Sequence, residues 1–142
     1  MKSFSVAVEI NAGPERVWTV LTDLHRWTTW NTTVEKVEGT MALGKRITVY
    51  ATIAKGRGFP VTVAEYAAPS KMTWVGGMPF GLFVGRRTFE LAKITADSTD
   101  FRMSETFTGL LEPLMSRALP DLQPAFDEFA QCLKREAETQ SG

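Results

Sequence analysis

An amphipathic pattern toward the C-terminal end of the chain predicts its longest helix. Leu122, Phe126, Phe129 and Leu133 recur at steps of four, three and four residues, which places them on one face of an α-helix. Asp121 is in position to cap the first turn, because its carboxylate can accept a hydrogen bond from a free backbone N–H group there. A face this rich in aromatic side chains needs a large apolar surface to pack against, and we expect the rest of the chain to supply it.

Alternation of apolar and polar residues predicts strands through most of the remaining chain. We expect these strands over residues 3–10, 34–39, 46–54, 59–66, 71–76, 83–95 and 99–108. Because short turns join most of them, the sheet is predicted to be antiparallel, since parallel neighbours need long crossover connections. Apolar residues at helical spacing predict two short helices, over 14–22 and 24–29, with Pro14 at the first helical position.

The alternation also assigns side chains to the two faces of the sheet, because successive residues of a strand point to opposite sides. In the strand over 46–54, the residues expected to share a face are Ile47, Val49, Ala51 and Ile53. In the strand over 59–66, the residues expected to share a face, opposite Tyr66, are Phe59, Val61, Val63 and Glu65.

The stretch between the last strand and the final helix is open to two interpretations. Its apolar residues continue the helical spacing from Leu111 to Leu122. The final helix therefore either begins near Pro113 and kinks between Pro120 and Pro124, or it follows a separate first turn.

Two charged residues fall on the apolar faces of the last two strands. Arg87 shares a face with Phe89, and Glu105 shares a face with Phe107. If both apolar faces point inward, Arg87 and Glu105 point inward too, and the short turn between the strands brings them within reach of each other. A charged side chain on an apolar face needs a partner or a ligand, so this pair is the main candidate for polar chemistry.

Composition narrows the class of protein. The chain has 142 residues, of which 44% are hydrophobic and 23% charged, and we expect one globular domain over 1–142. Sixteen basic residues balance sixteen acidic ones, which argues against a nucleic-acid partner, because such proteins carry a basic excess. The longest apolar runs are far short of a bilayer span, so no stable membrane insertion is expected. The N-terminal residues do not have the pattern of a signal peptide, and a lone cysteine cannot form an internal disulfide; both favour the cytoplasm.

The sequence offers little for metal or nucleophile chemistry. A structural zinc site needs about four Cys or His ligands, whereas the chain has only Cys132 and His25. We expect Cys132 to be a small buried residue on the final helix and His25 to face solvent in a turn. Neither a metal nor a cofactor is expected.

The order of these elements and several local motifs resemble the START-like helix-grip superfamily, also called SRPBCC, and within it the polyketide cyclase/dehydrase-like branch. The motifs that carry the resemblance are Ala12-Gly-Pro-Glu-Arg-Val-Trp18, Leu21-Thr-Asp23 with Trp27 and Trp30, Gly44-Lys-Arg46, Val63-Ala-Glu-Tyr-Ala-Ala-Pro-Ser-Lys-Met-Thr-Trp74, Arg87-Thr-Phe-Glu-Leu91 and Glu105-Thr-Phe-Thr-Gly-Leu-Leu111. The resemblance implies an α+β helix-grip fold: a curved seven-stranded antiparallel sheet around the long C-terminal helix, with two short helices after the first strand. It also implies an apolar cavity between sheet and helix that takes a lipid, a polyketide or another aromatic compound.

Three functions are compatible with these patterns. The first is binding of a small hydrophobic molecule in the cavity, by a monomer or a homodimer. The second is a cyclase, dehydratase or isomerase acting on such a molecule through Glu105, with Arg87 or Tyr50. The third is a protein-interaction module whose core is filled by its own side chains.

Aromatic, methionine and inward-facing residues make up the predicted ligand site, because such pockets are mostly apolar with a few polar groups. The predicted lining residues are Trp30, Tyr50, Phe59, Val63, Met72, Trp74, Phe83, Arg87, Phe89, Met103, Glu105, Phe107, Met115, Leu122, Phe126 and Phe129. The apolar loop over 79–83 is open to two interpretations. It either gates the cavity or touches a membrane or partner, or, as we expect, it packs on its own protein as a hydrophobic lid at the cavity mouth.

Overall fold

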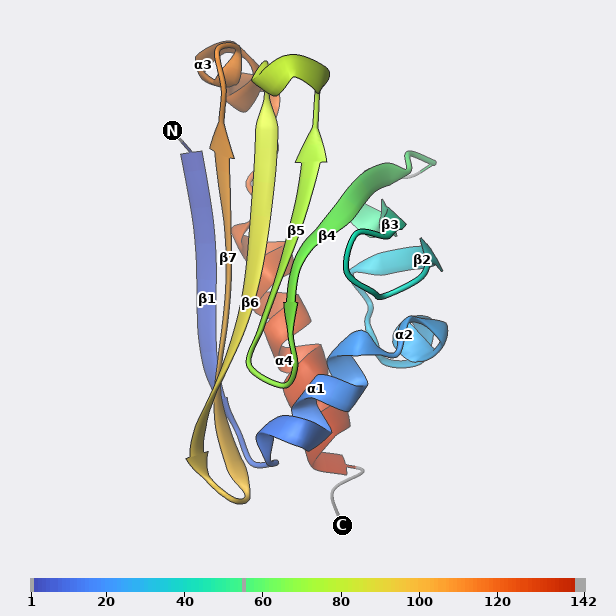
Figure 1. Cartoon of the computed structure of the whole chain (residues 1–142), viewed down its shortest axis with the longest axis vertical. Helices are drawn as coiled ribbons and strands as arrows, with labels where there is room; N and C mark the ends of the chain where they lie inside the picture. The colour runs from blue at the N-terminus through green and yellow to red at the C-terminus, as the bar shows by residue number, and fades with distance from the viewer. Residues whose placement is uncertain (1, 55, 140–142) are drawn as a thin grey trace.

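A single antiparallel sheet of seven strands, in the order β1-β7-β6-β5-β4-β3-β2, forms the framework of the protein. The structure is a computed structural model that describes residues 2–54 and 56–139. The strands are β1 (Lys2–Ile10), β2 (Val34–Gly39), β3 (Arg46–Ala51), β4 (Phe59–Ala67), β5 (Lys71–Gly77), β6 (Val84–Thr95) and β7 (Ser98–Thr108). Every pairing joins strands that are consecutive in the chain except that of β1 with β7, which places the first strand beside the last (Figure 1).

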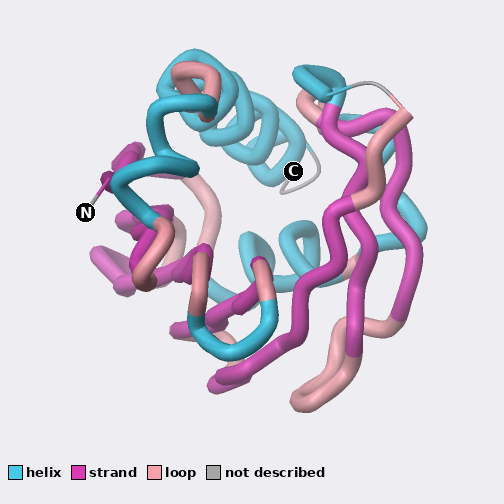
Figure 2. The backbone as a smooth tube through the Cα atoms, turned by 90° about the horizontal axis from the view of Figure 1, so that it is seen from above, coloured by secondary structure: helices cyan, strands magenta, loops and turns pink. Residues whose placement is uncertain are grey.

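The helices are α1 (Pro14–Thr22), α2 (Trp27–Trp30), α3 (Glu112–Met115) and the long α4 (Gln123–Thr139), with short 3-10 helices η1 (Leu24–Arg26), η2 (Thr52–Ala54), η3 (Pro79–Gly81) and η4 (Ser116–Ala118). The helices α1, α2 and α4 lie on one side of this sheet, and α3 lies at its upper end (Figure 1). Seen from above, the sheet curves around α4, as predicted (Figure 2). None of the helices among the described residues combines the length and apolar character that crossing a bilayer requires.

The apolar face of α4 packs into the curve of the sheet, which confirms the predicted helix. Phe126, Phe129 and Leu133 are each less than 5% exposed. At the start of the helix, the backbone N–H of Gln123 donates to Asp121 Oδ1 at 3.0 Å. The capping carboxylate predicted from the sequence is therefore in place.

Hydrogen bonds to β1 fix the far end of α4. Lys134 Nζ donates to the carbonyl oxygen of Glu9 at 2.8 Å and to Glu138 Oε2 at 2.6 Å. The backbone N–H of Asn11 donates to the same Glu138 oxygen at 2.8 Å. The Lys134 hydrogen bond, followed by the Asn11 N–H, holds the pKa of the Glu138 carboxyl below its usual value, because both favour the charged form.

The chain breaks between η4 and α4, which settles the open question about the final helix. Leu119, the residue before Pro120, has φ −73° and ψ 137°, an extended conformation that proline imposes on the residue preceding it. The segment α3–η4 is thus a separate unit at the top of the molecule, and α4 begins afresh beyond it (Figure 1).

Two local predictions about the strands are wrong. A bulge between Val63 and Glu65 adds a residue to β4, so Glu65 lies on the outer face, where its Oε1 accepts from Thr73 Oγ1 at 2.9 Å. Tyr66 lies on the inner face instead, with its ring 5.3 Å from Trp18. The third strand ends at Ala51 rather than continuing to residue 54, because the chain turns there into η2.

Candidate functional site

A row of directly opposed residues crosses the inner face of the sheet at mid-height. Trp74 on β5 faces Arg87 on β6, and Arg87 faces Glu105 on β7. Arg87 Nε donates to Glu105 Oε1 at 2.6 Å, with side-chain exposures of 29% for the arginine and 14% for the glutamate. The predicted inward-facing ion pair is confirmed, and it is in direct register.

Apolar side chains surround this ion pair. The Arg87 guanidinium carbon lies 4.9 Å from the centre of the Phe126 ring on α4, close enough for a cation–π contact. Gly85 lies one row above, where a Cβ atom would come within 3.1 Å of Phe107 Cε1 and 3.2 Å of Glu105 Oε2. Gly85 therefore allows the aromatic ring and the carboxylate to lie against the backbone of β6.

The interior above and below this row differs in packing. Below it, aromatic rings fill the space: the Trp27 ring lies 5.7 Å from Trp74 and 5.6 Å from Phe129, and Trp74 lies 4.9 Å from Phe89. Each of these four side chains is less than 5% exposed. The lower half of the grip is therefore a packed core.

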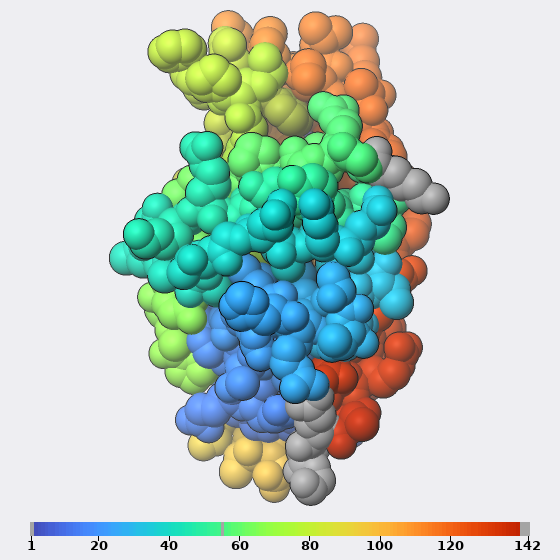
Figure 3. Space-filling view, turned by 90° about the vertical axis from the view of Figure 1, so that its right-hand side faces the viewer, coloured from blue at the N-terminus to red at the C-terminus, as the bar shows by residue number. Residues whose placement is uncertain are grey.

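Above the row, the inner face is only partly covered. Val61, Gly76 and Gly85 are half-buried on adjacent strands, and so is Leu122, which leads into α4. The space-filling view shows the surface indented between β4, in green, and the yellow-green and orange segments at the top (Figure 3). We call this region the upper recess, and we take as its base the row of Arg87 and Glu105, which is the next inward-facing row after Gly85 and Phe107 in the strand register.

The chemistry available at this base is hydrogen bonding and charge. Within residues 2–54 and 56–139, the guanidinium makes one hydrogen bond, through Nε to Glu105. A guanidinium has five N–H donors, and the carboxylate has a second oxygen. The pair can therefore donate to and accept from a polar group on a molecule whose remainder contacts the apolar walls.

Trp74 adds one polar atom to this interior. Its indole Nε1 is buried and has no hydrogen-bond acceptor among the described residues. A buried N–H group without a partner costs free energy. Trp74 is therefore a position in the core where a polar group lacks its hydrogen bond.

The structure divides the predicted lining residues by depth. Nine are buried: Trp30, Val63, Met72, Trp74, Phe89, Met103, Phe107, Phe126 and Phe129. Six are half-buried, namely Tyr50, Phe83, Arg87, Glu105, Met115 and Leu122. Phe59 is exposed, at 40%.

Tyr50 lies apart from the other candidates. It faces Lys36 across the β2–β3 pair, and Lys36 Nζ lies 4.5 Å from the centre of its ring. The inward side chain of β3 is the fully buried Ile47, and strand alternation puts Tyr50 on the opposite face. Tyr50 therefore does not contribute to the proposed site, whereas Phe59, which pairs with Val49, lies on the inner face at the rim.

The predicted lining set left out four buried aromatic residues of the core: Phe4, Trp18, Trp27 and Phe101. Trp27 is the most central of them, because it contacts three other rings and its Nε1 donates to the carbonyl oxygen of Leu21 at 2.9 Å. The spacing of Trp27 and Trp30 was the available signal.

The sole cysteine and histidine lie where the sequence places them. Cys132 is buried, with its Sγ 3.4 Å from Thr32 Oγ1, and His25 is exposed. In the part of the chain that the structure describes, no three His, Cys, Asp or Glu side chains are grouped so as to hold a metal ion.

Several solved structures share this architecture. The ZhuI aromatase/cyclase from Streptomyces sp. R1128 superposes with a TM-score of 0.73 at 16% identity, over 98% of this chain and 94% of that one. A norcoclaurine synthase point mutant from Thalictrum flavum gives 0.72 at 12% identity, over 99% and 96%. The protein TTHA0849 from Thermus thermophilus gives 0.71 at 19% identity, over 99% and 100%. At these identities the likeness shows the helix-grip fold and no more.

Sequence comparison goes further than the fold. No curated protein sequence matches the chain. Residues 1–138, however, match the sequence model of a family described as polyketide cyclase / dehydrase and lipid transport. Because that match spans almost the whole chain, the protein belongs to the polyketide cyclase/dehydrase and lipid transport family.

Proposed function

We propose that the protein binds a small hydrophobic molecule in the upper recess, with the Arg87–Glu105 pair contacting a polar group of that molecule. The observation that carries the proposal is an ion pair with side-chain exposures of 29% and 14% at the base of an otherwise apolar recess. Removing charges from water is costly, and a shielded pair that keeps unused donors and acceptors is suited to orienting a ligand. Family membership supports the same class of ligand.

The ligand expected from this chemistry is an aromatic or lipid-like molecule carrying a carbonyl, hydroxyl or carboxylate oxygen. Phe107 and Phe126 flank the ion pair and offer aromatic surfaces to a flat apolar body. One structural neighbour is an aromatase/cyclase, which makes aromatic polyketides the first compounds to test.

The test is a thermal-shift screen of aromatic polyketides, flavonoids and lipids. A ligand that binds the folded state raises the melting temperature. We expect at least one compound to do so, and Arg87→Met to weaken its binding by about tenfold, the loss of roughly one charge-assisted hydrogen bond. The matched control is Arg102→Met on the outer face of the same sheet, where Arg102 Nε pairs with Asp100 Oδ2 at 2.8 Å.

Either of two results would contradict the proposal. One is a screen in which no compound shifts the melting temperature of the wild-type chain. The other is an equal loss of ligand affinity in Arg87→Met and Arg102→Met, which would show that the ligand does not contact Arg87 in the recess.

A cyclase, dehydratase or isomerase reaction is the second candidate, favoured by a carboxylate that faces the recess and is hydrogen-bonded to Arg87. A positioned carboxylate can act as a general base toward a bound substrate. Glu105→Gln separates the two candidates: loss of product formation with binding retained supports an enzyme, whereas binding without product in the wild type supports a carrier.

A further inference from the structure

Two apolar tips meet at the top of the molecule, beyond the upper recess. The loop containing η3 joins β5 to β6, and α3–η4 follows β7; the backbone N–H of Leu111 donates to the carbonyl oxygen of Leu82 at 2.7 Å and connects them (Figure 1). The large apolar side chains exposed on these tips are Met78 at 37%, Phe80 at 96%, Leu110 at 81% and Leu114 at 66%. We call these four residues the apical apolar surface.

Phe80 is held outward by its backbone. It has φ 60°, the left-handed region that a bulky residue adopts only at a cost. With 96% of the side chain exposed, packing against the described residues does little to offset this cost. The predicted lid is therefore wrong for Phe80, although Phe83 does pack inward, with its ring 5.4 Å from Phe107.

The charge around this surface is basic. The two segments that form the tips, residues 76–86 and 108–119, contain three charged residues: Arg86, Glu112 and Arg117. Arg86 and Arg117 lie at the surface beside the tips, whereas Glu112 is only 6% exposed and accepts a hydrogen bond from Ser116 Oγ at 3.1 Å. Within these two segments the exposed charge is thus positive and the one carboxylate is buried, whereas the exposed carboxylate of Asp121 lies two residues beyond them.

We propose that the apical apolar surface docks on the surface of an anionic lipid bilayer. Exposed aromatic and leucine side chains insert at the boundary between head groups and acyl chains, and nearby basic side chains are attracted to anionic lipids. A second copy of the chain is a poorer occupant, because tip-to-tip contact would bring Arg86 and Arg117 of both copies together. The tips also project from the molecule (Figure 1), a shape that suits a deformable surface.

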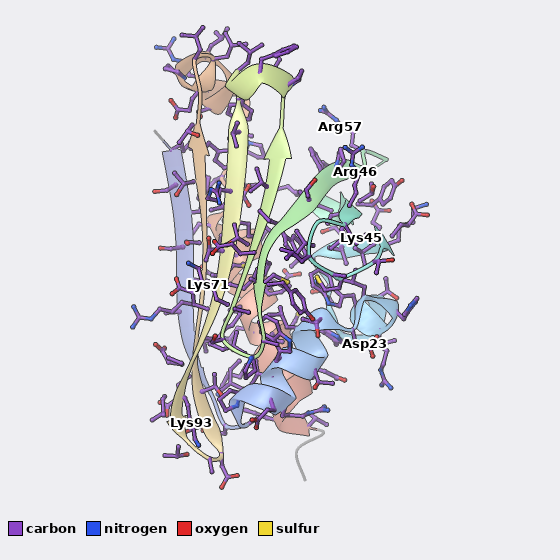
Figure 4. All side chains as sticks on the ribbon, in the orientation of Figure 1. Asp23, Lys45, Arg46, Arg57, Lys71 and Lys93 are labelled. Atoms are coloured by element: carbon purple, nitrogen blue, oxygen red, sulfur yellow. The ribbon has the colours of Figure 1, made fainter. Side chains whose placement is uncertain are left out.

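The opposite lip of the recess, formed by Ile53, Arg57 and Phe59, also combines exposed apolar side chains with a basic one. Ile53 is 48% exposed and Phe59 40%, and Arg57 lies beside them, with its guanidinium carbon 5.6 Å from the centre of the Phe59 ring. Figure 4 places Arg57 toward the upper part of the molecule and Lys93 at its opposite end. A bilayer that contacts both lips would cover the opening of the recess, but docking itself does not depend on what the recess binds.

The experiment is co-sedimentation of the full chain with two kinds of vesicle. One is pure phosphatidylcholine, and the other contains about 30 mol% phosphatidylserine. We expect binding to the anionic vesicles that weakens as salt is raised, since salt screens the attraction. Phe80→Asn, which tolerates the left-handed backbone, and Leu114→Ser are each expected to lower the partition coefficient by about tenfold. Arg117→Glu is expected to lower it by a similar factor.

Matched controls lie at the other end of the sheet. Ile94 is 50% exposed near the end of β6, so Ile94→Ser removes a comparably exposed apolar side chain. Lys93→Glu makes the same change in charge as Arg117→Glu. Both controls should stay within about twofold of the wild type, and melting temperatures of all variants confirm that they fold.

Two outcomes would overturn the inference. One is that the wild-type chain binds the two kinds of vesicle equally or binds neither. The other is that the control variants lose as much binding as the apical variants. Ligand binding by Phe80→Asn in solution, without vesicles, tests the proposed function separately, because that variant leaves Arg87 and Glu105 intact. If the variant keeps ligand affinity but loses vesicle binding, the two proposals are distinguished.

Discussion

Replacing Trp27 by alanine is expected to lower the free energy of unfolding by about 4 kcal/mol, the range found when large aromatic side chains are removed from packed cores. The side chain is 2% exposed and contacts the rings of Trp30, Trp74 and Phe129. Its loss would leave a cavity and remove the hydrogen bond to the Leu21 carbonyl. Urea unfolding followed by circular dichroism measures the change.

The control for this prediction is an aromatic residue on the surface. Phe80 is 96% exposed, so Phe80→Ala should change the free energy of unfolding by no more than about 0.5 kcal/mol. A loss below about 1 kcal/mol in Trp27→Ala would mean that the lower half of the grip is not the packed core described above.

Breaking the Arg87–Glu105 pair is expected to cost about 2 kcal/mol, because Arg87→Met leaves a largely buried carboxylate without its partner. The side-chain exposures of 29% and 14% place the pair between surface and fully buried examples. The double variant Arg87→Met with Glu105→Gln should recover part of the loss, giving a coupling energy of about 1–2 kcal/mol in a double-mutant cycle.

A second cycle on the outer face provides the comparison. Arg102 and Asp100 also pair through Nε, at 2.8 Å, but with exposures of 68% and 31%. Their coupling should be below about 0.5 kcal/mol, as for other exposed pairs. Equal coupling in the two cycles would show that the recess does not shield Arg87 and Glu105 from solvent.

The inward ion pair could be predicted from the sequence because two short-range rules suffice. Alternation assigns Arg87 and Glu105 to the apolar faces of their strands, and the tight β6–β7 connection fixes the register between those strands. The observed register pairs the two residues directly. Similarly, the spacing of Phe126, Phe129 and Leu133 was enough to identify the buried face of α4.

Other features depend on events that a periodic pattern does not contain. The bulge between Val63 and Glu65 shifts the alternation of β4 by one residue and moves Tyr66 inward. Trp27 reaches the centre of the core only because the short helices fold back over the sheet (Figure 2). The number of rings that Trp27 meets follows from that tertiary placement, since local spacing constrains only neighbours on the same helix.

Local rules alone were enough to avoid one misplacement and to settle one open question. Tyr50 alternates with Val49 and Ala51, so the pattern itself already placed it on the outer face. Leu119 precedes Pro120, and the restriction that proline imposes on the preceding residue predicts the break before α4 that the structure has. By contrast, the exposure of Phe80 could not be predicted, because an apolar loop residue packs or projects according to its backbone conformation.

The most direct test of the central claim is a ¹H–¹⁵N correlation titration of the labelled chain with the compound that raises its melting temperature most. A ligand in the upper recess is expected to shift the amide signals of Gly76, Gly85 and Glu105 and to leave the far end of the sheet unchanged. The far end has a hollow of about 310 Å³ lined by residues that include Ser70, Lys93 and Ala96. Shifts confined to that hollow, or no shifts at saturating ligand, would contradict the account.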